Sequence, residues 1–183
     1  MTRSRIILVG KGASGKDHAR TILTEMMGMQ YGVSYTTRPP RENEVEGKDY
    51  YFRSHKFFEE MKAKDEWFEY VEFNGWLYGT TKDQFYGDCN VFIMTPKGLA
   101  HLSEEDRQDS CVIYFDIDAT IRAQRMSERK GDADSIHRRL SADEEDFKDF
   151  DDYDVIITSP SYEAADLIDV VRVYLAHKPI ARV

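Results

Sequence analysis

The sequence has 183 residues, 41% of them hydrophobic, which is enough to bury one sizeable core and to support a small inserted lobe. Its net charge of −9 argues against a nucleic-acid partner, because a phosphate backbone is usually met by a strongly clustered positive surface. Small anionic substrates stay open, since a few arginines create a local positive region in an acidic protein.

The cysteines and the N-terminal residues bear on the cellular compartment. Cys89 and Cys111 form neither a closely spaced pair nor part of a ligand cluster, so we expect reduced thiols rather than a zinc site or a disulfide. The N-terminal residues lead directly into a strand pattern, with no apolar stretch long enough for a signal or membrane helix. We therefore expect a cytoplasmic protein with no membrane partner, either a monomer or a homodimer.

Strand and helix patterns alternate through most of the chain. Short apolar runs predict strands at residues 5–9, 91–94, 112–115 and 155–157. Apolar positions at helical spacing predict helices at residues 16–27, 120–129, 135–150 and 162–176. Asp118 and Asp134 are the expected caps of the second and third of these helices. Strands that alternate with helices imply an α/β fold, a parallel sheet core flanked by helices.

Two segments depart from this alternation. Residues 32–87 contain two prolines and many tyrosines, and we interpret them as an inserted substrate-binding lobe in a single domain whose core is 1–31 and 88–183. The charged run Glu-Arg-Lys-Gly-Asp-Ala-Asp at 128–134 lies between two predicted helices. It suggests a lid over about 126–138, although a solvated helix connection is the alternative.

A glycine-rich run follows the first predicted strand and opens the first predicted helix. Such a turn exposes backbone N–H groups to phosphate oxygens, and the positive end of the helix points at the same place. Lys16 then reaches the outer phosphates, so the pattern predicts an ATP site rather than a simple glycine turn. The expected nucleotide-binding residues are Gly10, Gly12, Ala13, Ser14, Gly15, Lys16 and Asp17.

Asp17 stands where this motif normally has Ser or Thr, whose hydroxyl contacts Mg²⁺. A carboxylate is a hard oxygen ligand and can hold Mg²⁺ directly or through water, but it also brings negative charge close to the phosphates. We therefore name Asp17 as the candidate metal residue. The alternative is an acidic residue that merely interacts with the positive end of the helix.

A second candidate phosphate site lies in the run Ser-Tyr-Thr-Thr-Arg-Pro-Pro-Arg at 34–41. A planar guanidinium matches the oxygens of a phosphate, and the prolines stiffen the loop and bias Arg38 toward an extended backbone. Arg38 and Arg41 are thus presented at low entropic cost, whereas a loop restrained only for stability is the alternative. Two phosphate sites in one chain suggest a phosphotransferase.

This segment, continued to residue 52, and the segment Glu-Tyr-Val-Glu-Phe-Asn-Gly-Trp-Leu-Tyr-Gly-Thr at 69–80 resemble the guanylate kinase family closely. The similarity runs from about residue 5 to the final helix, and it implies the fold of a P-loop nucleoside monophosphate kinase. By this resemblance, the acceptor phosphate is held by Arg38, Arg41, Tyr50 and Tyr78. The guanine is read by Ser34, Glu69 and Thr80. The transferring phosphoryl group is met by Lys16, Arg38, Arg125, Arg129 and Arg139.

The chemistry of guanine agrees with these assignments. A carboxylate such as Glu69 accepts from both the ring N–H and the exocyclic amine, and adenine offers no equivalent ring donor. We expect Arg122 and Arg138 on the solvent face of their helices. Because Arg139 shares its helix with acidic residues, surface ion pairing is the competing explanation for its presence.

The chain departs from the family pattern in two further places. The stretch Met-Thr-Pro-Lys-Gly at 94–98 lacks the acidic residues that the family usually places there, and Thr158-Ser159 replaces an Asn-Asp pair. We hypothesise that Asp17 makes up for the carboxylate lost from 94–98. Phosphate-binding loops that end in Lys-Asp also resemble those of some viral deoxynucleotide kinases, which leaves the sugar and the exact base open.

The expected reaction moves the γ-phosphoryl group of ATP, with Mg²⁺, onto GMP or dGMP, giving ADP and the diphosphate. One alternative is a kinase for another or a modified deoxynucleoside monophosphate. The other is a catalytically weak binding module that grips a phosphorylated protein through Arg38, Arg41 and Tyr50. The intact Gly10, Gly15 and Lys16 argue against this module.

Overall fold

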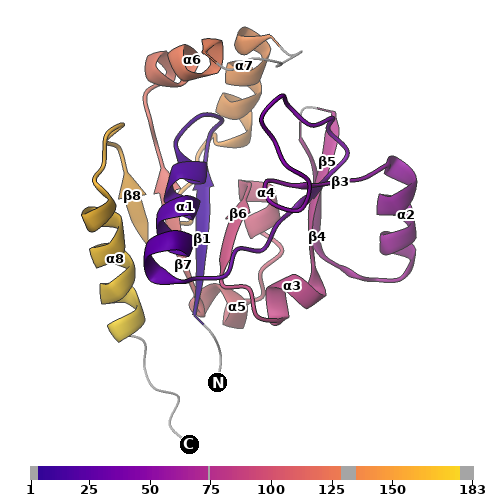
Figure 1. Ribbon diagram of the computed structural model, residues 1–183, viewed down its shortest axis with the longest axis horizontal. Coiled ribbons are helices and arrows are strands. Elements are labelled where there is room, and N and C mark those ends of the chain that lie inside the picture. Colours follow the sequence, from indigo (N-terminus) through magenta and orange to yellow (C-terminus); the bar gives the residue numbers. More distant parts are fainter. Residues whose placement is uncertain (1–3, 74, 129–134, 178–183) are drawn as a thin grey trace, which may run out of the picture.

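A parallel sheet forms the centre of the computed structural model, which describes residues 4–73, 75–128 and 135–177 (Figure 1). Its strands lie in the order β6-β1-β7-β8, and all neighbouring strands are parallel. They are β1 (Arg5–Gly10), β6 (Val91–Met94), β7 (Ser110–Phe115) and β8 (Val155–Ile157). The α/β class and the strands expected from the apolar runs are confirmed.

Successive residues of β1 fill two separate cores. Ile6 and Leu8 pack with α1 (Lys16–Met27) and α8 (Ala164–His177) on one face of the sheet. Ile7 and Val9 pack on the other face with aromatic side chains such as Phe85 and Phe92. All these β1 side chains are completely buried, as an apolar run in a central parallel strand requires. The sheet is thereby held rigidly, with the carboxyl end of β1 leading into the glycine-rich loop.

A second, smaller sheet is formed within residues 35–81. Its strands lie in the order β3-β2-β5-β4 and are accompanied by one helix. These elements are β2 (Tyr35–Thr36), β3 (Tyr51–Phe52), α2 (His55–Ala63), β4 (Trp67–Phe73) and β5 (Trp76–Thr81). The sheet and α2 enclose a cluster of their own around Phe58, Met61 and Trp67. In Figure 1 this unit lies on the side of β6 away from α8.

Three short helices follow the second sheet along the chain: one leads from β5 into β6, and two lie between β6 and β7 of the central sheet. They are α3 (Lys82–Tyr86), α4 (Pro96–Leu99) and α5 (Glu104–Gln108). α3 begins with a capping box, in which the Thr81 side chain accepts from the Gln84 N–H and the Gln84 side chain accepts from the Thr81 N–H. None of the helices in the described ranges is long and apolar enough to cross a membrane.

Two helices, α6 (Ala119–Ser127) and α7 (Ile136–Asp146), lie above the carboxyl end of β1 in Figure 1. The Asp118 carboxylate accepts from the Thr120 N–H and caps α6, as expected. Ser135 caps α7, while the expected cap Asp134 lies outside the described residues. α7 is five residues shorter than the predicted range, whereas the ends of α6 and α8 differ from their predicted ends by one or two residues.

Candidate active site

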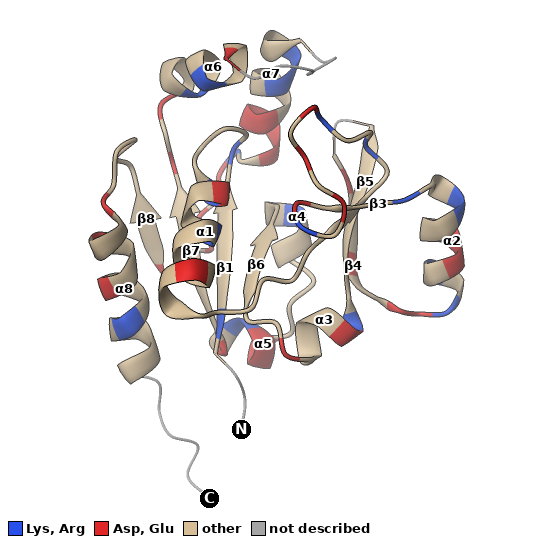
Figure 2. Cartoon of the chain, in the orientation of Figure 1, with Lys and Arg blue, Asp and Glu red and all other residues tan. Residues whose placement is uncertain are grey.

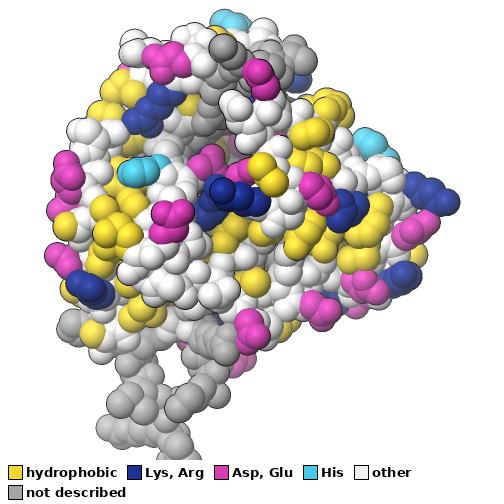
Figure 3. All heavy atoms as spheres, viewed as in Figure 1, with side chains coloured by type: hydrophobic (Ala, Val, Ile, Leu, Met, Phe, Trp, Pro, Cys, Tyr) yellow, Lys and Arg dark blue, Asp and Glu magenta, His cyan; other side chains and the backbone are white. Residues whose placement is uncertain are grey.

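One cavity of about 480 Å³ connects the glycine-rich loop with the second sheet. Its walls include the predicted donor-loop residues, the expected acceptor residues except Thr80, and one arginine from each of α6 and α7. Figure 3 shows the surface hollowed below the α6 and α7 region, with basic and acidic side chains near the hollow. The predicted residues that line the cavity are Gly10, Gly12, Ala13, Ser14, Gly15, Lys16, Asp17, Ser34, Arg38, Arg41, Tyr50, Glu69, Tyr78, Arg125 and Arg139.

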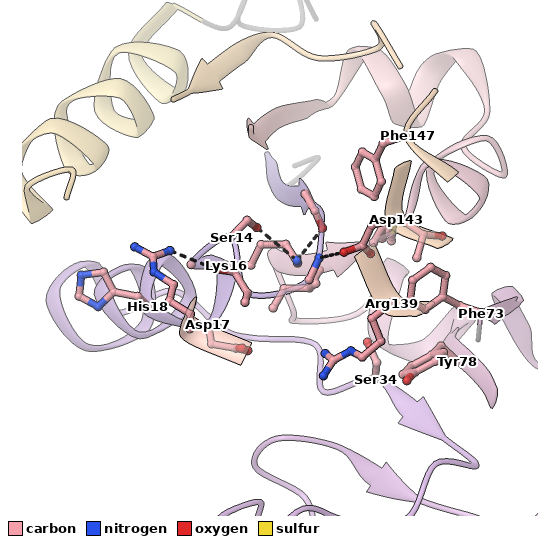
Figure 4. A pocket seen from close by; sticks show the side chains of 18 of the residues that line it. Ser14, Lys16, Asp17, His18, Ser34, Phe73, Tyr78, Arg139, Asp143 and Phe147 are labelled. Atoms are coloured by element: carbon pink, nitrogen blue, oxygen red, sulfur yellow. Dashed lines mark hydrogen bonds between the residues drawn. The ribbon is translucent and has the colours of Figure 1, made fainter. Parts of the chain in front are cut away.

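The donor end is built by the turn from β1 into α1. Gly15 has a φ of 103°, a left-handed conformation that favours glycine and starts the helix abruptly. The Lys16 ammonium lies back over the loop and donates to the Gly10 carbonyl at 2.6 Å and to the Lys11 carbonyl at 3.0 Å (Figure 4). The loop therefore presents main-chain amides and one ammonium group at the same end of the cavity, which is an arrangement suited to a polyphosphate.

Two side chains from distant elements fix the outside of this loop. The Arg125 guanidinium of α6 donates to the Ala13 carbonyl at 3.1 Å and to the Pro160 carbonyl at 2.7 Å. The Tyr162 hydroxyl donates to the Gly15 carbonyl at 3.1 Å. Burial raises the pKa of Tyr162 to about 12, so the phenol keeps its proton. Arg125 thus lies at the donor end, and Pro160 and Tyr162 are cavity residues that the sequence did not reveal.

Asp17 lines the cavity in the first turn of α1. Within the described residues, no three His, Cys, Asp or Glu side chains are grouped as a metal site. Mg²⁺ is commonly held by one or two carboxylates together with phosphate oxygens and water. A single carboxylate beside a phosphate-binding loop fits that coordination.

The acceptor-phosphate end already contains a carboxylate of the protein. Arg38, only 8% exposed, donates through one nitrogen to both oxygens of Glu44, at 2.7 and 2.9 Å. Arg41 donates to the same side chain from its guanidinium at 3.1 Å and from its backbone N–H at 2.8 Å. Although partial burial acts to raise it, these hydrogen bonds lower the pKa of Glu44. Glu44 therefore holds the two guanidinium groups close together through charge-assisted hydrogen bonds.

Phenol rings surround these arginines. The Arg38 guanidinium lies 5.4 Å from the centre of the Tyr50 ring, and the Tyr50 and Tyr78 rings meet edge to face at 6.0 Å. Burial raises the pKa of Tyr50 well above its ordinary value, so this phenol is a neutral hydrogen-bond donor. The arrangement offers both charged and neutral donors to an anion.

The end of the cavity that is expected to bind the base is centred on Glu69, which is 5% exposed. Burial raises the pKa of this carboxyl to about 7, against the lowering effect of the Thr80 hydroxyl, which donates to it at 2.9 Å. Thr80 is completely buried behind Glu69, so it supports the carboxylate rather than lining the cavity. Apolar side chains flank the group and suit the faces of a planar base: Val71, Phe73, Ile93 and Met94.

Comparison with known proteins identifies the family of the chain. A family model described as guanylate kinase matches residues 2–173, which is nearly the whole chain. The chain belongs to the guanylate kinase family. The resemblance seen in the sequence is therefore confirmed, together with the expected fold and enzyme class, a P-loop nucleoside monophosphate kinase.

Individual guanylate kinases align over most of their length. The protein of Nostoc sp. is 32% identical over 167 residues, covering 87% of this chain and 84% of that protein. The protein of Rubrobacter xylanophilus is 29% identical over 182 residues, covering 94% and 95%. The crystal structure of guanylate kinase from Anaplasma phagocytophilum matches with a TM-score of 0.69 at 19% identity, covering 98% of this chain and 88% of that one. This last match supports the fold.

One expectation about the arginines is wrong. Arg122 is not on a solvent face: it is 1% exposed and forms an ion pair with Asp143, whereas Arg138 is exposed as expected. Arg139 is 9% exposed and points into the cavity between the donor loop and Tyr78 (Figure 4). Arg129 lies outside the described residues.

Some residues of this guanylate kinase-like site could have been found from spacing alone. Glu44 follows Arg41 by three residues in a stiffened loop, and Asp143 follows Arg139 by four residues on one helix face. Thr95 has a different function, because its hydroxyl accepts from the Gly98 N–H and caps α4. The structure thus places a helix cap where the sequence shows a missing carboxylate.

Proposed function

We propose that this protein transfers the γ-phosphoryl group of ATP to GMP or dGMP, giving ADP and the corresponding diphosphate. The observation that carries the proposal is the single cavity that joins the donor loop to the Arg38 and Arg41 pair. Phosphoryl transfer needs no enzyme nucleophile; it needs two anions held in line while their repulsion is screened. A cavity with cationic groups at both phosphate ends meets that need.

Each chemical group of the cavity has a place in this reaction. The loop amides from Ala13 to Asp17 and the Lys16 ammonium bind the donor phosphates, while Arg38, Arg41, Tyr50 and Tyr78 bind the acceptor phosphate. Arg139 points into the space between the two ends, where charge develops during transfer (Figure 4). Arg125 contacts the donor loop and Pro160, a position that suits the donor nucleotide more than the transferred group.

Mg²⁺, when bound to ATP, would screen the phosphate charge, and Asp17 is the residue we propose to hold it. Asp17→Ala and Asp17→Ser variants test this assignment by Mg²⁺ titration of the initial rate. The alanine variant should need more Mg²⁺ for half-maximal rate, and the serine variant should approach the wild type because its hydroxyl suits the same position. An unchanged Mg²⁺ dependence in both variants would remove Asp17 from the metal site.

Closure is the second part of the proposal. We propose that residues 32–87 move as a lobe, and about 126–138 as a lid, over a core made of 1–31 and 88–183. Support comes from the separate sheet and core cluster within 35–81. An open site would hydrolyse ATP, so closure protects the transferred group from water. We also propose that the protein acts in the cytoplasm as a monomer or homodimer, without nucleic acid, in keeping with its net charge of −9.

The choice of base rests on Glu69. Its buried carboxylate accepts from the ring N–H and exocyclic amine of guanine, and a base without those donors leaves it unpaired, at about 1–3 kcal/mol. A second candidate, a kinase for another deoxynucleoside monophosphate, is favoured by the 94–98 segment, where the Thr95 hydroxyl caps a helix instead of a carboxylate facing the base.

The decisive experiment measures ADP formation from ATP and Mg²⁺ with a panel of ribo- and deoxynucleoside monophosphates. We expect GMP, dGMP or both to give the highest kcat/KM, and the Glu69→Gln variant to lose that preference. If another monophosphate is preferred, the second candidate replaces the first. If no monophosphate stimulates ADP formation while GMP or a phosphopeptide still binds, the protein is a binding module.

A further inference from the structure

A fully buried arginine links α6 to α7 next to the donor loop. Arg122 donates to the Ile117 carbonyl at 3.0 Å, to the Asp143 carboxylate at 3.0 Å and to the Glu144 carboxylate at 3.0 Å. The side chains of Arg122 and Asp143 are 1% and 3% exposed. A buried ion pair often adds little net stability, because removing both charges from water offsets their attraction. This pair therefore calls for a reason other than stability.

Asp143 also contacts the donor loop. The same oxygen that pairs with Arg122 accepts from the Gly12 N–H at 2.9 Å, a bond drawn in Figure 4. The approach is so close that a Cβ atom on Gly12 would lie 3.2 Å from this oxygen and 2.9 Å from the Met126 side chain. Glycine at this position thus allows the loop to rest directly against α6 and α7.

A second ion pair ties the same elements together at the surface. The Lys11 ammonium of the donor loop lies 2.8 Å from the Glu144 carboxylate of α7. Burial raises the pKa of Asp143, although the Gly12 hydrogen bond and the nearby Lys16, Arg122 and Arg139 charges act in the opposite direction. Keeping this carboxylate ionised thus has an energetic cost, as is common for groups that serve a site.

Arg139 depends on this contact for its position. It lies four residues before Asp143, and therefore on the same face of α7 one turn away. Its guanidinium nitrogen would be 3.7 Å from a Cβ atom on Gly12, so loop and arginine are neighbours. Any shift of α7 against the loop would move Arg139 relative to the donor phosphates.

We infer that Asp143 is a positioning residue: held by Arg122, it binds the Gly12 amide and so fixes α7, with Arg139, against the phosphate-binding loop. This inference rests on the proposed kinase function. It assigns Asp143 and Arg122 no contact with substrate; both act through Arg139 and the loop. The expected consequence is a loss of kcat with little change in KM for GMP, since the acceptor end lies elsewhere in the cavity.

Two double variants isolate the bond to Gly12. Arg122→Met with Asp143→Asn and Arg122→Met with Asp143→Leu both remove the buried charges, but only the first keeps an oxygen that can accept from the Gly12 N–H. We expect kcat about tenfold to a hundredfold lower in the leucine variant than in the asparagine variant, because small misplacements of catalytic groups have effects of this size. Equal kcat values in the two folded proteins would overturn the inference.

A mutant cycle tests whether the effect passes through Arg139. In an Arg139→Ala background, replacing asparagine by leucine at position 143 should lower kcat by less than about threefold, since the residue to be positioned is absent. A full effect in that background would contradict the inference. Glu145→Gln, an exposed change on the same helix, is the matched control and should leave kcat unchanged. If the leucine variant does not fold, Gly12→Ala takes its place in the same cycle.

Hydrogen exchange separates this inference from the proposed function. The amide of Gly12 should exchange at least about tenfold faster in the leucine variant than in the asparagine variant, whatever reaction the protein catalyses. If Gly12 exchanges faster in the leucine variant but the wild-type protein has no kinase activity, the contact exists and the proposed function is wrong. Unchanged exchange in an active enzyme would mean that the positioning role is wrong.

Discussion

The donor and acceptor ends of the cavity are made from different kinds of groups. The donor end consists mainly of backbone amides in the turn between β1 and α1, on the rigid parallel sheet. The acceptor end consists of side chains from the smaller sheet and its loops. At a site made of backbone amides few side chains contribute directly, Lys16 among them, whereas a site made of side chains depends on each residue. The two ends should therefore respond differently to mutation.

Each end also holds a carboxylate of the protein, but in a different way. Asp143 is fully buried and is fixed by Arg122 beside the loop. Glu44 is more exposed, at 16% of its side chain, and it occupies the guanidinium groups that we propose bind the substrate. Figure 2 shows both acidic and basic residues along this acceptor loop. Asp143 thus fixes the donor end. At the acceptor end, Glu44 holds the guanidinium groups, and the substrate phosphate must compete with it for them.

The largest effect is expected from Lys16→Met. Loss of the ammonium group should lower kcat about a hundredfold to a thousandfold, because a preorganised positive group at the phosphates is removed. KM for GMP should change little, since Lys16 lies at the donor end. Steady-state kinetics measure both values, with the exposed Lys64→Met as control. A rise in KM for GMP as large as the fall in kcat would break the division into two ends.

Arg38→Lys should affect the acceptor end instead. Lysine keeps the charge but cannot match two oxygens with a planar fork, and charge-assisted bonds of this kind contribute about 1.5–3 kcal/mol. We expect kcat/KM for GMP to fall about tenfold to a hundredfold, with KM for ATP nearly unchanged. Arg53→Lys, directly after β3 of the smaller sheet and outside the cavity lining, is the matched control. An equal loss in the control variant would point to a general effect on the sheet.

The pH dependence of GMP binding sharpens the assignment of Glu69. Burial raises the pKa of this group to about 7, and guanine needs the ionised form as acceptor. KM for GMP should therefore rise as the pH falls below about 7, by up to about tenfold per unit. The Glu69→Gln variant should lack this dependence. A pH effect caused by protonation of the substrate phosphate would persist in the variant, so the comparison distinguishes the two causes. A wild-type KM that stays constant between pH 8 and 6 would contradict the assignment.

The smallest effect concerns stability. A carboxyl whose pKa is higher in the folded than in the unfolded state destabilises the fold once it ionises, so the loss appears as pH rises from about 4.5 to about 7. Glu69→Gln removes this loss and should raise the free energy of unfolding at pH 8 by about 1–3 kcal/mol, with no gain at pH 4. Urea unfolding at both pH values measures it, and exposed Glu72→Gln on the same strand is the control. A destabilised Glu69→Gln protein at pH 8 would show that burial of this charge is not a liability.

The sequence predicts the sheet core well because strand and helix patterns alternate along the chain. In such a chain, a short apolar run such as Ile6 to Val9 indicates a buried parallel strand. It also predicts the donor loop, since that site needs only glycines and a lysine at fixed spacing. Arg122 was misplaced because helical spacing cannot reveal its partner Asp143, which lies 21 residues further along the chain. Tyr162 was missed for the same reason: its contact with Gly15 spans 147 residues. Such partners are set by tertiary packing, which local patterns do not record.

The chain has only two tryptophans, and both belong to the smaller sheet. Trp67 is 6% exposed and stacks on Phe58 with 4.6 Å between ring centres, while Trp76 opens β5. Intrinsic indole emission therefore reports on this sheet alone, and near-ultraviolet signals can follow it separately from the tryptophan-free core. A stopped-flow mixing experiment with GMP, without any attached dye, would therefore test in real time the lobe movement that we propose.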